Sequence, residues 1–137
     1  VVSGPQTDSI NPAAAREAGV ALERTMWVGV ADLAAATALC LDSCAVVVVH
    51  GSVSRREAQR LQARAANVSA TLIFATVHAA TDIGADVTFT SSDAHWSGLL
   101  GGYGHLMERE ITLDVRARHA PQMSPAAVRL HDVPAHA

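Results

Sequence analysis

Lysine is absent from this 137-residue sequence, and aromatic residues make up only 4% of it. All ten basic residues are arginines, and the formal net charge is −3. A chain of this charge is not expected to bind nucleic acid over its whole surface or to be attracted to an anionic membrane. Because 50% of the residues are hydrophobic but few are aromatic, the core must be built from alanine, valine and leucine. The length is that of one domain.

Long apolar runs and a signal-peptide pattern are also missing. No stretch approaches the roughly 18 apolar residues of a membrane span, and the N-terminal residues lack a positively charged region. The cysteines, Cys40 and Cys44, lie four residues apart on an expected helix, where a disulfide between them would be strained. We therefore expect two reduced, packed thiols in a cytoplasmic protein with no membrane partner.

The most informative stretch is the valine run 46–49, which ends in His50 and Gly51. Valine is stiff at χ1 and suits a pleated backbone, so the run predicts a strand buried on both faces at the centre of a parallel sheet. A capped helix is expected to follow it. This is the layout of an open α/β domain, in which ligands gather at the carboxyl ends of the strands.

Helix and strand signals alternate over the first half of the chain. Asn11-Pro12 and Asp32 predict helix starts, and Ser54 with Glu57 has the spacing of a capping box. The third helix should bury Ala58, Leu61, Ala65 and Val68. Strands are expected at the extreme N-terminus, over 25–30, and over 70–76.

The second half has a different pattern. Apolar and polar residues alternate over 86–91 and over 108–118, which predicts half-exposed antiparallel strands, and a last short strand is expected over 127–130. An irregular glycine-rich connection is expected from His95 onward. The predicted fold class is α/β, with a βα-alternating core over 1–76 and a strand-rich part over 86–132 in one domain, 1–137.

Common catalytic and metal-binding motifs are not recognised. The glycine-rich stretch 98–104 has no lysine and leads into a strand, so it is not expected to hold a phosphate. The sequence after His50 lacks the second glycine of a nucleophile elbow. The seven histidines show no paired ligand spacing. We therefore expect no catalytic residue, no metal and no cofactor.

Two groups of side chains remain as candidate binding residues. Arg56, Arg60 and Arg64 recur along one face of the third helix, where they form either a solvated face or contacts to phosphates or an acidic partner. Trp96 and Tyr103 flank the glycine-rich stretch, and each is either an interface anchor or a plug at the edge of a core. With Leu99 and Leu100 they form the candidate partner-binding patch.

The order of these motifs resembles RecA-type recombinases. The stretch 11–24 resembles the helix and turn before a core strand of that family, 45–52 resembles the Walker B strand and its exit, and 71–76 the next core strand. The stretches 96–99, 104–106 and 109–110 are more similar to ImuA-type proteins, RecA-like accessory factors of bacterial damage-induced mutagenesis, above all to the actinobacterial form. The resemblance implies a truncated RecA-like core.

Departures from the family pattern fall at its functional positions. His50 stands where the family has the Walker B aspartate, and Thr7, or Asp8 in a register shifted by one, where it has the glutamate that orients water. Val77 stands near the position at which the family has its nucleotide-sensing glutamine. The connections that would correspond to the DNA-binding loops are short. Losing the metal ligand and the water-orienting group leaves little phosphoryl-transfer catalysis.

The resemblance therefore implies a catalytically inactive adaptor in SOS-induced translesion synthesis. Its partner would be an ImuB-like inactive Y-family polymerase homologue and, through it, an error-prone polymerase and the sliding clamp. DNA contact would be weak or indirect, and a homo-oligomer is left open. Two alternatives stand: an ATP-binding, DNA-dependent ATPase completed by a phosphate loop upstream of Val1, and a SulA-like cell-division inhibitor.

Overall fold

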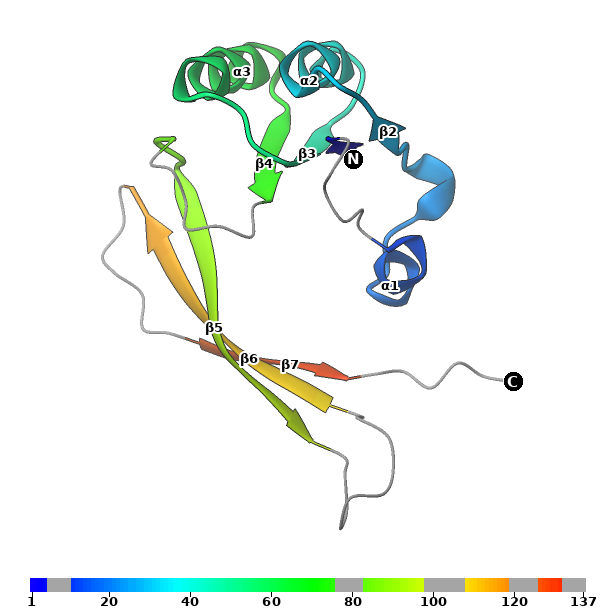
Figure 1. Ribbon diagram of the computed structural model, residues 1–137, viewed down its shortest axis with the longest axis vertical. Helices are drawn as coiled ribbons and strands as arrows, with labels where there is room; N and C mark the ends of the chain where they lie inside the picture. The colour runs from blue at the N-terminus through cyan, green and yellow to red at the C-terminus, as the bar shows by residue number, and fades with distance from the viewer. Residues whose placement is uncertain (5–10, 76–82, 98–107, 119–125, 132–137) are drawn as a thin grey trace. The chain divides into compact units, whose positions relative to one another are not determined.

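A computed structural model describes residues 1–4, 11–75, 83–97, 108–118 and 126–131 (Figure 1). The chain divides into two compact units, Val1–Gly84 and Ala85–Ala137. The first contains a four-stranded parallel sheet with helices, and the second a three-stranded antiparallel sheet. The fold class is therefore α/β, as predicted. That the two units form one RecA-like domain stays a prediction.

The parallel sheet has the strand order β2-β1-β3-β4. Its strands are β1 (Val2–Ser3), β2 (Val28–Gly29), β3 (Val46–His50) and β4 (Thr71–Ala75). The valine strand β3 pairs in parallel with both β1 and β4, which confirms its predicted central place. The strand predicted over 25–30 is much shorter, because its described pairing is with the two-residue strand β1 and covers Val28 and Gly29. A 3-10 turn, η1 (Leu22–Arg24), comes before it.

Each predicted helix start is confirmed by a side-chain cap. Helix α1 (Pro12–Glu17) begins after Asn11, and α2 (Leu33–Leu41) begins after Asp32. Helix α3 (Arg55–Val68) begins after Ser54 with a complete capping box. Figure 1 shows α2 and α3 side by side over one face of the sheet, with α1 on the other side.

The core lies between the sheet and helices α2 and α3. Val47 and Val49 of β3 are buried, together with Val2, Leu41, Leu61 and Ala65. Val46 is 55% exposed and Val48 is half-buried, so β3 is not buried on both faces as its composition predicts. Successive side chains of a strand point to opposite faces, and α2 and α3 cover only one of them. Ile73 of β4, at 45% exposure, lies on the same open face as Val46.

Two further predictions for the first unit concern the C-terminal end of α3 and the cysteines. Val68 is exposed instead of buried, because Ser69 ends the helix in the left-handed conformation and Val68 lies beyond the packed face. Ala58, Leu61 and Ala65 are buried as predicted. Cys40 and Cys44 are both free thiols, packed against the edge of the core.

The antiparallel sheet of the second unit has the order β5-β6-β7. Its strands are β5 (Val87–Ser97), β6 (Glu108–Ala117) and β7 (Ala126–His131). Strand β5 continues through His95, where an irregular connection was expected, because pairing with β6 resumes after a bulge between Ser92 and His95. None of the helices in the described parts of the chain is long and apolar enough to cross a membrane.

Candidate functional site

The carboxyl ends of the parallel strands are where an α/β sheet of this kind holds its ligands. Strand β1 leads toward β2 on one side, and β3 leads toward β4 on the other, so the connections diverge between β1 and β3. His50 ends β3 at this point, paired in register with Ser3, and its carbonyl accepts a hydrogen bond from the Gly4 N–H at 3.2 Å. Gly51 follows with φ +139°, a conformation that favours glycine, and turns the chain out of the sheet.

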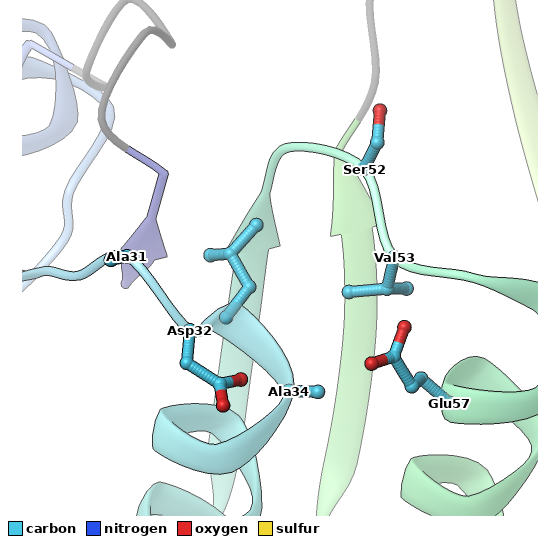
Figure 2. A pocket seen from close by; sticks show the side chains of 7 residues that line it. Ala31, Asp32, Ala34, Ser52, Val53 and Glu57 are labelled. Atoms are coloured by element: carbon cyan, nitrogen blue, oxygen red, sulfur yellow. The ribbon is translucent and has the colours of Figure 1, made fainter.

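A hollow of about 400 Å³ lies at this end of the sheet, between the starts of α2 and α3 (Figure 2). Its lining comes from the β2–α2 connection and the β3–α3 connection: Ala31, Asp32, Leu33, Ala34, Ser52, Val53 and Glu57. The hollow is an open depression and not an enclosed cavity. Figure 2 shows the Ser52 hydroxyl directed away from the two carboxylates.

Both carboxylates of the hollow already cap a helix. One oxygen of Asp32 accepts a hydrogen bond from the Ala35 N–H at 2.9 Å. Oε2 of Glu57 accepts one from the Ser54 N–H at 2.8 Å, and Oγ of Ser54 accepts one from the Glu57 N–H at 3.3 Å. These bonds satisfy N–H groups that would otherwise be available to an anion at the helix N-termini.

The electrostatics of the hollow disfavour phosphate. Hydrogen bonding to the Ser54 side chain, and then to its backbone N–H, lowers the pKa of Glu57, although the negative charge of Asp32 acts in the opposite direction. Glu57 is therefore ionised at neutral pH. No arginine is among the described residues that line the hollow, although the positive charge of Arg60 also contributes to lowering the pKa of Glu57. A phosphate placed there would meet fixed negative charge, so the hollow does not suit a nucleotide's phosphates.

His50, the residue expected at the family's magnesium-ligand position, is not among the lining residues. Val49 is fully buried on the helix-covered face, so the next residue, His50, lies on the opposite face and is half-buried. Thr7 and Val77 lie outside the described residues. In the described parts of the chain, no group of three or more His, Cys, Asp or Glu side chains could hold a metal ion.

Of the three predicted arginines of α3, Arg64 forms an ion pair with Asp42. Nε of Arg64 donates to Oδ1 of Asp42 at 3.1 Å, and a second bond joins Nη2 to Oδ2, so α3 is tied to the C-cap of α2. Hydrogen bonding to Asp42 raises the pKa of Arg64. Arg56 and Arg60 are exposed. Arg64 is also exposed, but a partner or a phosphate would have to compete with Asp42 for its guanidinium.

Of the predicted partner-binding patch, the structure describes Trp96. Its side chain is 46% exposed, and the Arg109 guanidinium lies 5.3 Å from the centre of its ring. Strand pairing places these residues opposite each other on β5 and β6. A stacked arginine restrains the indole while leaving part of it accessible. Leu99, Leu100 and Tyr103 lie outside the described residues.

Sequence reasoning identified Asp32, Ser54 and Glu57 as helix caps but did not predict that they surround a hollow. It also missed Phe89, which is 66% exposed on β5. The alternation of Val87 and Phe89 with threonines marks a two-faced strand, but it does not reveal which face stays uncovered.

Comparison with known proteins identifies a family for the first unit. Residues 6–86, more than half of the chain, match the MT3502 N-terminal domain. This segment ends within two residues of the division between the two units. Neither a curated protein nor a solved structure matches the chain. The match shows that the chain belongs to the MT3502 N-terminal domain family.

Proposed function

We propose that this chain is a non-catalytic, RecA-like adaptor of the ImuA type, acting in the cytoplasm in SOS-induced translesion synthesis. Its direct partner would be an ImuB-like inactive Y-family polymerase homologue, which connects it to an error-prone DNA polymerase and the sliding clamp. The proposal is supported by the resemblance of the sequence and by the chemistry of the site.

One observation carries the non-catalytic part of the proposal. The hollow at the carboxyl ends of the strands is bordered by two carboxylates that are engaged as helix caps. The imidazole that replaces the expected aspartate lies on the other face of the sheet. Phosphoryl transfer depends on positioning and charge compensation, and these side chains supply neither to a triphosphate.

Trp96 supports the adaptor part of the proposal. Tryptophan and arginine are the side chains most often found at the energetic centre of an interface, and here they form a half-exposed stack. An exposed tryptophan supplies a large contact area, and its position is restrained before binding.

Co-expression of the full chain with an ImuB-like protein, followed by size-exclusion chromatography, tests the partner. We expect the two proteins to elute together, and Trp96→Ala to reduce the shared peak while the domain stays folded. Thr90→Ser, an exposed change on the same strand, is the matched control and should leave the peak unchanged. A folded Trp96→Ala variant that binds normally would reject this surface.

Nucleotide titration of the full chain separates the adaptor from the ATPase alternative. The adaptor proposal predicts no magnesium-dependent ATP hydrolysis above background. Hydrolysis that is abolished by His50→Ala would instead favour an ATPase. Cell filamentation on overexpression would favour the SulA-like alternative.

A further inference from the structure

Helix α2 leaves apolar side chains uncovered on its outer side. Except for Thr37, which is buried, every residue of the helix is apolar. A helix that is apolar all round is typical of a position covered by other elements on every side. Here Leu39 is 72% exposed, the highest value among the large hydrophobic side chains that the structure describes. Ala35, one turn earlier, is exposed as well.

Helix α3 carries the row of arginines on its own outer side. Arg56, Arg60 and Arg64 are four residues apart, so they lie one above the other along the helix, and all three are exposed. Among the residues that the structure describes, neither Arg56 nor Arg60 forms an ion pair. Arg56 also lies in the first turn of α3, where the helix dipole disfavours a positive charge. Its charge therefore does not serve the stability of the helix.

The packing of the two helices brings Leu39 and the arginines onto one surface. Both helices begin at the hollow and run side by side over the same face of the sheet (Figure 1). Leu39 is the seventh residue of α2 and Arg60 the sixth of α3, so the two lie at about the same level. We call the surface formed by the exposed side chains of both helices the α2–α3 outer surface: Ala35, Leu39, Arg56, Arg60 and Arg64.

Asp42 shows how this surface binds a carboxylate. Its two oxygens accept hydrogen bonds from Nε and Nη2 of Arg64, the paired geometry in which a guanidinium binds a carboxylate most strongly. Arg60 and Arg56 lie one and two turns nearer the start of α3 and have no such carboxylate among the described residues. Carboxylates spaced by one helical turn on another chain would match them.

We propose that the α2–α3 outer surface binds an acidic, amphipathic helical segment of a partner protein. Carboxylates of this segment pair with Arg56 and Arg60, and an apolar side chain next to them covers Leu39. Charge complementarity sets the sign of the partner. Leu39 favours a protein over a nucleic acid, because a phosphate backbone has nothing apolar to place on it. An apolar centre with arginine beside it is also the usual composition of a protein interface.

This inference goes beyond the proposed function and does not depend on it. The α2–α3 outer surface belongs to the first unit, whereas Trp96 belongs to the second. The partner is defined here only by its chemistry, a segment with carboxylates on one side and apolar side chains on the next.

A designed peptide tests the surface on the full chain. The probe has four repeats of Leu-Glu-Ala-Ala with blocked ends, which places leucines and glutamates on neighbouring sides of one helix. Fluorescence anisotropy of the labelled peptide should show saturable binding that weakens as salt is added, because the ion pairs are exposed. A peptide with glutamine in place of every glutamate should bind about five-fold or more weakly.

Substitutions on each helix divide the contact into its two parts. Arg56→Gln combined with Arg60→Gln should raise the Kd of the peptide about three- to ten-fold, since each exposed ion pair contributes modestly. Leu39→Ala should raise it about five- to ten-fold through lost apolar burial. The matched control combines Arg16→Gln with Arg24→Gln, which removes the same charge from exposed positions elsewhere and should leave the Kd unchanged. Circular dichroism checks that each variant is folded.

The outcomes are distinct. Absence of saturable binding up to about 1 mM peptide, or equal binding of the glutamine peptide, would overturn the proposal whether or not the variants fold. Equal losses in the control and the test variants would overturn it too. A mixed-sequence DNA duplex that binds more tightly than the peptide, and is unaffected by Leu39→Ala, would assign the surface to nucleic acid instead. A dimer in light scattering that Leu39→Ala dissociates would assign it to a second copy. No ImuB-like protein is present, so the proposed function can fail without changing these results.

Discussion

Thr37 of helix α2 is fully buried, and its hydroxyl has no hydrogen-bond partner among the residues that the structure describes. A buried donor without a partner costs its desolvation energy, whereas a methyl group of similar size does not. Thr37→Val should therefore raise the free energy of unfolding by about 1 kcal/mol. Chemical denaturation, followed by circular dichroism, measures the change.

Thr25 is the matched control for this prediction. Its hydroxyl donates a hydrogen bond to the Ala21 carbonyl at 2.8 Å, so Thr25→Val should lower stability by about 1 kcal/mol. If both substitutions moved stability in the same direction, hydrogen bonding would not be what distinguishes the two threonines.

Glu57 makes the stability of the first unit depend on pH. Its pKa is lowered in the folded state, mainly by hydrogen bonding to the Ser54 side chain. Its contribution is therefore present above the ordinary pKa of 4.5 and is lost as the pH falls through the lower, folded-state value. Glu57→Gln keeps an oxygen acceptor for the Ser54 N–H but removes this titration.

Thermal unfolding of both proteins across this pH range measures the effect. The wild type should exceed Glu57→Gln in stability at neutral pH, and the difference should shrink as the solution is acidified. A constant difference would show that the capping carboxylate does not contribute through its charge.

At the scale of an element, substitutions in strand β3 test how the parallel sheet packs against the helices. Val47 is 2% exposed beneath the helices, whereas its neighbour Val46 is on the open face. Val47→Thr should cost about 1–3 kcal/mol because it buries a hydroxyl without a partner. Val46→Thr should change stability by less than about 0.5 kcal/mol. Equal losses in denaturation experiments would contradict one-sided burial.

Local signals predicted the elements of the first unit well. Asn11, Asp32 and the Ser54–Glu57 pair identified the helix starts because a cap involves residues only two or three positions apart. The valine run identified its strand and its central place. Whether both faces of that strand are covered depends on which helices pack on the sheet, and the valines themselves do not encode this.

In the second unit too, local features could be predicted from the sequence, but features that depend on strand pairing could not. The alternation over 108–118 predicted β6, because alternating polarity is a local property. The position of Trp96 depends on the β5 bulge, which reverses the alternation and becomes visible only when β5 is paired with β6. Sequence spacing could therefore identify Trp96 as a candidate anchor but could not assign its face or its contact with Arg109.

At the scale of the whole molecule, the two units carry different parts of the proposed function. The first has a parallel sheet with a hollow at the carboxyl ends of its strands, bordered by two helix-capping carboxylates. The second presents apolar and aromatic side chains on one face of a sheet. The candidate site could be predicted only in part, because the hollow and the position of Trp96 both depend on pairing between distant strands.

Calorimetric titration of a purified ImuB-like protein into the full chain tests the adaptor account most directly. The account predicts a saturable binding heat, an affinity reduced about ten-fold or more, which is roughly 1.4 kcal/mol, by Trp96→Ala, and no change with His50→Ala. The absence of binding between two folded proteins, or an affinity that depends on His50 and not on Trp96, would contradict it.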